Sequence, residues 1–144
     1  MSIRDQQAEL WFDEWIWLDD QSTSTWAHTW RLPPEKWLNL GNTVQAQFIF
    51  DYWASGPGAG DLNIGVEQSP HRTMDDDCWH SLIDSANFQT TRMHDSTGRI
   101  VGQDGSPYDN YPRGWGRVVV TNGSGSLNNW AVVRLRCMVR LLPA

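Results

Sequence analysis

The sequence predicts an all-β protein, an antiparallel β-sandwich or jelly roll of about seven or eight strands. Apolar residues recur at every second position in several segments, which is the period of a strand with one buried face. The charged residues give the second indication, because ten of the 11 cations are Arg and 13 of the 17 acids are Asp. Lys and Glu, which commonly cover exposed helices, are scarce, and no segment has the pattern of a helix of ordinary length.

The chain of 144 residues has the size of one domain and can bury a core without disulfides. We expect its two cysteines, Cys78 and Cys137, to be buried thiols. The formal charge of −6 has the wrong sign for binding a phosphate backbone, so we expect no nucleic-acid partner. No run approaches the roughly 18 apolar residues of a membrane helix, and no signal segment is recognisable, so we expect no membrane partner.

The clearest strand runs from Trp130 to Leu142. Its alternate positions from 131 to 141 are apolar, and the opposite face carries Trp130 with three arginines. Residues Trp115 to Thr121 alternate in the same way. Because the loop at 122–129 is rich in Gly, Ser and Asn, we expect the two strands to pair as an antiparallel hairpin.

Upstream, Val44–Tyr52 and Leu62–Val66 alternate on either side of a Gly-rich connection at 56–61, which predicts a second hairpin. Trp26–Leu32 is expected to form a strand that Pro33-Pro34 ends, followed by at most one helical turn. The region from 69 to 114 is the least regular. We expect short strands at 81–83 and 88–93, and a long surface loop at 102–114.

The first strand, Leu10–Leu18, is apolar at both parities apart from Asp13 and Glu14. Such a strand is covered on both sides, either within the domain or by a neighbour. We therefore expect residues 1–24 to be a Trp-rich N-terminal arm or strand that takes part in docking or oligomer contacts. Residues 25–144 are then the β-sandwich domain.

One segment gathers residue types that bind metals. His71 and His80 enclose Asp75–Asp77 and Cys78, which are ligand types of zinc and calcium sites. The spacing matches no established zinc or calcium signature, and three adjacent Asp on an extended chain point to different sides. We interpret the segment as a solvated acidic loop before a strand, with a metal site as the alternative.

Motifs of enzymes are missing from the sequence. There is no Gly-x-Ser-x-Gly elbow, no glycine-rich phosphate loop and no dinucleotide fingerprint. His28 lies on one strand face between Trp26 and Trp30, where a structural imidazole is expected. Paired carboxylates occur at 13–14 and 19–20, but nothing places two of them across a cleft. We expect no enzymatic activity, no catalytic residue and no cofactor.

Tryptophan is the unusual residue, since six of the ten lie in the first 37 positions. Trp11, Trp15 and Trp17 share one parity of their strand, and Trp26 and Trp30 share a face of the next. A sandwich of this size does not easily bury six indoles from two adjacent strands, and indoles suit the centre of a protein interface. Two other interpretations stay open, a Trp-rich core and a sugar-stacking platform.

Five segments together carry a resemblance to a known group of proteins: Val44–Phe50, Asp61–Pro70, Trp79–Ile83, Tyr111–Val120 and Ala131–Cys137. In their order and strand character, they resemble the small β-sandwich proteins that decorate or complete tailed-bacteriophage particles. The resemblance covers roughly two-thirds of the chain, from about residue 42 to the C-terminus. Residues 1–41 do not match the pattern.

The resemblance implies a non-enzymatic virion structural protein, a decoration or cement protein that bridges subunits of a major capsid protein. It also implies a homo-oligomer, typically a trimer, that is made in the host cytoplasm and lies on the outer capsid surface. Aromatic and Arg anchors suit such a contact. The expected partner interface consists of Trp11, Trp15, Trp17, Trp26 and Trp30, with Arg134, Arg136 and Arg140 as polar partners.

Two alternatives remain. A carbohydrate-binding module shares the sandwich and the aromatic surplus, and it predicts a monomer with exposed, coplanar indoles. A tail-fibre or baseplate domain differs from a decoration protein mainly in where it attaches.

Overall fold

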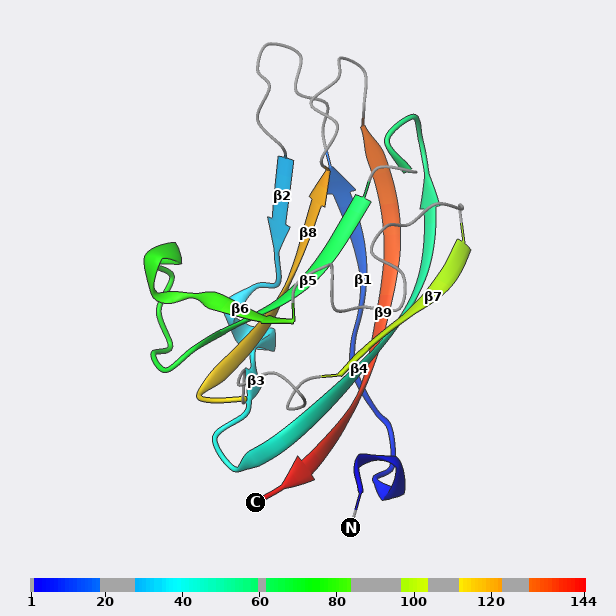
Figure 1. Ribbon diagram of the computed structural model, residues 1–144. Helices are drawn as coiled ribbons and strands as arrows, with labels where there is room; N and C mark the ends of the chain where they lie inside the picture. The colour runs from blue at the N-terminus through cyan, green and yellow to red at the C-terminus, as the bar shows by residue number, and fades with distance from the viewer. Residues whose placement is uncertain (1, 19–27, 60–61, 84–96, 104–111, 123–129) are drawn as a thin grey trace.

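The computed structural model describes residues 2–18, 28–59, 62–83, 97–103, 112–122 and 130–144. Within these ranges the chain forms nine strands in two antiparallel sheets (Figure 1). The predicted all-β sandwich is confirmed, with nine described strands instead of seven or eight. The strands are β1 (Glu9–Leu18), β2 (His28–Arg31), β3 (Leu38–Asn39), β4 (Thr43–Ser55), β5 (Leu62–Ser69), β6 (His80–Ile83), β7 (Thr97–Gln103), β8 (Trp115–Asn122) and β9 (Ala131–Pro143).

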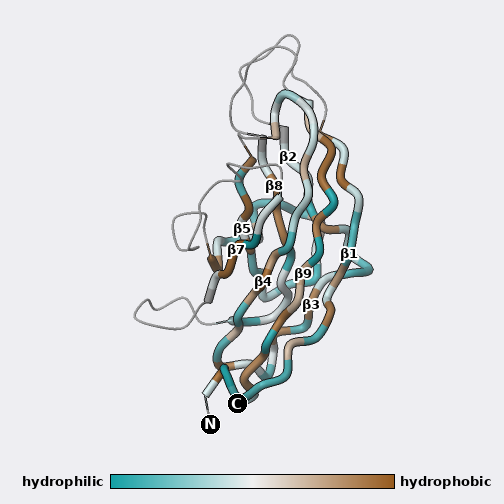
Figure 2. Tube along the Cα trace, turned by 90° about the vertical axis from the view of Figure 1, so that its right-hand side faces the viewer, coloured by the Kyte–Doolittle hydropathy of each residue, from teal (hydrophilic) through white to brown (hydrophobic). Residues whose placement is uncertain are grey.

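The first sheet has the strand order β1-β9-β4-β7, and the second has the order β2-β8-β5-β6, with β3 also paired to β8. Hydrophobic and hydrophilic residues alternate along β9 and its neighbours (Figure 2). The inward positions of both sheets meet in one buried core, to which Phe48, Ile64, Val118 and Val133 all belong. Among the described residues, no helix is long and apolar enough to cross a membrane.

Both predicted hairpins are wrong. β8 and β9 lie in different sheets, and so do β4 and β5. Each of these strands has one apolar face, which is buried whether the next strand lies in the same sheet or in the facing one, so alternation does not decide the pairing. The connections at 56–61 and 123–130 have six and eight residues, which is enough to cross the ~10 Å between packed sheets.

Several smaller expectations can be compared with the described residues. The strand at 81–83 and the single turn after Pro33 are confirmed as β6 and the turn Pro34–Lys36. The strand expected at 88–93 lies outside the described residues, as does most of the loop at 102–114. β7 was not predicted. Both cysteines are free, with Cys137 buried as expected and Cys78 only partly so.

β1 is an integral strand of the first sheet, paired with β9 from Glu9 to Leu18. Phe12, Ile16 and Leu18 are buried in the core. Residues 9–18 of the segment 1–24 are therefore a strand of the sandwich. Its docking role stays a prediction.

The acidic segment at 75–77 is tied to a buried arginine. Arg117, only 3% exposed, donates hydrogen bonds to Glu67 at 2.9 Å and to Asp76 at 3.0 Å. Its guanidinium lies over the ring of Trp79, 4.2 Å from the centroid. Asp75 accepts a hydrogen bond from the backbone N–H of Asp77 in the turn Asp76–Cys78. In the part of the chain described, no group of three or more potential ligands is placed to hold a metal ion.

This contact generates a stability prediction. Arg117→Ala removes the charged hydrogen bonds to Glu67 and Asp76 and the contact with the Trp79 ring, while Asp76 keeps Arg31 at 3.5 Å. We expect a loss of about 2 kcal/mol in the free energy of unfolding. Arg99→Ala is the control, because Arg99 is 65% exposed and its ion pair with Asp51 is screened by solvent. Urea unfolding of both variants measures the difference. Equal stability of the two variants would contradict the role assigned to Arg117.

Candidate functional site

The outer face of the β1-β9-β4-β7 sheet carries four exposed tryptophans, which we call the tryptophan patch. Trp15 and Trp17 on β1 are 61% and 57% exposed, Trp53 on β4 is 45% exposed, and Trp130, just before β9, is 36% exposed. They are four of the seven large hydrophobic residues found exposed among the described residues. Apolar surface gathered in this way marks a site of interaction.

Strand register builds the patch. Trp15 lies opposite Arg134 on β9, and Arg134 lies opposite Trp53 on β4, so one row crosses three strands. Trp15 and Trp53 meet edge to face, with ring centroids 5.7 Å apart at 77°. Trp17 stacks on Trp130, with centroids 5.6 Å apart and ring planes only 9° from parallel. The indoles therefore contact one another in two pairs, over a surface about three strands wide.

The neighbouring row is charged, and we call it the charged row. Asp13 on β1, Arg136 on β9, Asp51 on β4 and Arg99 on β7 lie opposite one another in register. Arg99 donates two hydrogen bonds to Asp51, at 2.6 and 3.1 Å. Arg134, which lies between Trp15 and Trp53, donates two hydrogen bonds to Asp13, at 3.1 and 3.0 Å. A hollow lies where the two rows meet, lined by Asp51, Tyr52, Trp53, Arg134 and Arg136.

The contact with Arg134 changes the titration of Asp13. Hydrogen bonds from Arg134 lower the pKa of Asp13 below its ordinary value of 3.8, and the charge of Arg136 acts in the same direction. Because the folded-state pKa is depressed, the stabilisation is complete above the unfolded pKa. It is lost as the pH falls through the folded-state pKa.

Arg134→Gln removes the main cause of this shift, and we expect the pKa of Asp13 to rise towards 3.8. Carbon-13 NMR titration of the side-chain carboxyl measures the change. Arg99→Gln is the matched control, since Arg99 hydrogen-bonds Asp51 and not Asp13. An Asp13 pKa that responds equally to both variants would contradict the pairing.

The structure brings together four of the predicted interface residues, Trp15, Trp17, Arg134 and Arg136. Arg140 is further along β9, six residues or about 20 Å from Arg134, and donates to Gln47 at 2.8 Å. Trp26 lies outside the described residues.

Trp11 does not share the exposed face of Trp15 and Trp17. A bulge in β1 between Leu10 and Phe12 breaks the alternation at this residue. The Trp11 ring packs against Phe12 and Phe48, with centroids 5.2 and 5.7 Å away, and its Nε1 donates to the carbonyl of Lys36.

Trp30 on β2 packs against the core as well, 6.3 Å from the ring of Phe12. The Trp-rich-core interpretation therefore holds for some of the six tryptophans in the first 37 positions, namely Trp11, Trp30 and the buried Trp37.

Sequence reasoning missed Trp53 and Trp130 as site residues. Trp53 continues the outward parity of Asp51 on β4, so carrying the alternation past Tyr52 would have placed it on this face. Trp130 has the parity of the β9 arginines, which the sequence already indicated.

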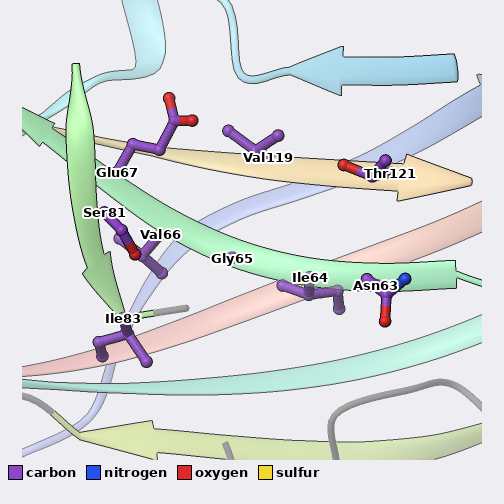
Figure 3. A pocket seen from close by; sticks show the side chains of 9 residues that line it. All are labelled: Asn63, Ile64, Gly65, Val66, Glu67, Ser81, Ile83, Val119 and Thr121. Carbon is purple, nitrogen blue, oxygen red and sulfur yellow. The ribbon is translucent and has the colours of Figure 1, made fainter. Parts of the chain in front are cut away.

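The outer face of the second sheet is different. A hollow there has Gly65 between Asn63 and Glu67 on β5, with Val119 and Thr121 of β8 along one side (Figure 3). No aromatic side chain is among its lining residues in the part of the chain described. This hollow of the second sheet therefore lacks the aromatic surface found on the first sheet.

No protein-family model matches the chain, and no curated protein matches it. Among solved structures, it is similar to one described as "CBM4 structure and function", at 15% identity and a TM-score of 0.46, covering 96% of this chain and 79% of the other. It is similar to a non-crystalline cellulose specific carbohydrate-binding module, CBM28, at 12% identity and a TM-score of 0.43, covering 92% of this chain and 75% of the other. It is also similar to a chain of black queen cell virus, at 13% identity and a TM-score of 0.42, covering 99% of this chain and 71% of the other.

Proposed function

We propose that this protein is a non-enzymatic virion structural protein that decorates or cements a tailed-bacteriophage capsid. In this role it is made in the host cytoplasm and lies on the outer capsid surface, bridging major capsid protein subunits. The observation that carries the proposal is the tryptophan patch. Indoles and guanidinium groups are the side chains that most often dominate protein interfaces, and here they share one sheet face.

The charged groups beside the patch support a binding role and not a catalytic one. Asp13 and Asp51 are each held by two hydrogen bonds from an arginine. A general acid or base works best with a pKa near the operating pH, whereas the pKa of Asp13 is lowered from an already acidic value.

The geometry of the rings favours this proposal over a glycan platform. Sugar-stacking platforms offer coplanar indoles side by side, but Trp17 and Trp130 stack on each other, with ring centroids 5.6 Å apart. Trp15 and Trp53 are close to perpendicular. Such rings make a rugged apolar surface, which suits the interdigitating side chains of a protein partner.

A carbohydrate-binding module is the second candidate, favoured by the hollow beside Trp53. There Asp51 and Arg136 are polar groups next to an exposed indole, an arrangement that could receive a sugar ring and its hydroxyls. A tail-fibre or baseplate domain would use the same face at a different attachment point.

Truncating the patch tests the docking role. We expect the double variant Trp15→Ala, Trp53→Ala to lose attachment to capsids in a co-sedimentation assay, since anchors of this kind contribute about 2 kcal/mol or more each. The β-type circular dichroism should be retained, because both rings are exposed. Met74→Ala is the control, as Met74 is 68% exposed and lies outside the patch. Undiminished attachment of the double variant would contradict this face as the interface.

Native mass in solution separates the two candidates. We expect light scattering on a sizing column to give a trimer, near three times 16.5 kDa. A monomer whose tryptophan emission shifts with oligosaccharides would favour the carbohydrate-binding module instead.

A further inference from the structure

Arg136 lies in the middle of the charged row, between Asp13 and Asp51. Its cross-strand neighbours, Asp13 and Asp51, are held by Arg134 and Arg99. No hydrogen bond or ion pair engages the Arg136 guanidinium within the described ranges, although its charge acts on Asp13. Its donors are therefore available to a ligand.

The local charge points to the sign of that ligand. Three arginines face two aspartates across these rows, an excess of one positive charge on a chain whose formal charge is −6. The excess lies beside exposed indoles, and a partner that covers these rings would exclude water and strengthen an ion pair formed there. Arg136 and Arg134 both line the hollow next to Trp53.

We propose that this hollow binds a carboxylate side chain, Asp or Glu, of the partner protein, with an apolar residue of the partner packed on Trp15 and Trp53. The inference rests on the proposed docking function and names the chemistry that the partner must present. A guanidinium offers paired N–H donors in the geometry of a carboxylate, so the contact would be bidentate.

A second copy of this face is a poor occupant of the same hollow. In a two-fold contact each residue faces its own equivalent near the axis. A contact centred on the hollow would place Arg136 against Arg136, where like charges repel. The charge argument therefore favours a different, acidic surface.

The test uses the full chain and poly-L-glutamate as the probe, at low ionic strength, with tryptophan emission as the signal. The chain is acidic overall, so a polyanion has no general attraction for it. We expect saturable binding that weakens about tenfold or more in Arg136→Gln. The affinity of Arg136→Lys for poly-L-glutamate should lie between those of the unsubstituted chain and Arg136→Gln, since Lys keeps the charge and loses the paired donors. Urea unfolding checks that each variant is folded.

Arg113→Gln is the matched control, because Arg113 is exposed and lies outside this face. No saturable signal from the unsubstituted chain, or an equal loss in the Arg113 and Arg136 variants, would overturn the inference. Tighter binding of alginate or heparin than of poly-L-glutamate would also overturn it, because the ligand would then be an anionic polysaccharide.

Capsid co-sedimentation separates failure of this inference from failure of the proposed function. Attachment lost in Trp15→Ala, Trp53→Ala but complete in Arg136→Gln would overturn the carboxylate contact and leave the docking face intact. Attachment retained in both variants would overturn both. Attachment reduced in both, and more salt-sensitive in the unsubstituted chain than in Arg136→Gln, is the expected result.

Discussion

The pairing of β9 with both β1 and β4 is the constraint on which the rest of the first sheet depends. β9 runs through the middle of that sheet, and its inward residues, such as Val133, Leu135 and Cys137, are fully buried. A slip of one residue would move this apolar set to the solvent face, so burial holds the register. The same register decides which outward side chains meet, because alternation gives each strand two faces.

The tryptophan patch and the charged row are consequences of that register. Arg134 meets Trp15 on one side and Trp53 on the other, and Arg136 meets a carboxylate on each side. Cross-strand neighbours are close enough for ring contacts and hydrogen bonds, so these contacts form within both rows once the core is packed. The outer face thus combines an apolar surface with ordered charges, and the second sheet has no such aromatic surface at its described hollow.

Local alternation was informative wherever a strand had one apolar face. In β9, the positions predicted to form the apolar face are buried from Ala131 to Val139, whereas Val44 on the predicted apolar face of β4 is exposed. β7 was not predicted because Gly98 and Gly102 interrupt the alternation of apolar and polar residues along it. The structure explains Gly98, since a Cβ at this position would lie 2.6 Å from the hydroxyl of Tyr52. Trp11 was misplaced because a bulge alters the parity of a strand without a signal in composition. Asp76 is exposed, as expected of a solvated acidic loop, and it also pairs with buried Arg117, which the sequence did not indicate.

The sequence by itself determined the all-β class, the extent of most strands and, in strands without a bulge, many of the side chains that face outward, because these follow from a period of two along the chain. The tertiary structure decided which strands pair. Turn-rich connections do not distinguish a hairpin from a crossing between sheets, and the choice is made by burying both apolar layers against each other. That choice brought Trp53 to Trp15 and set Arg136 between two engaged carboxylates, contacts between residues that lie far apart in the chain.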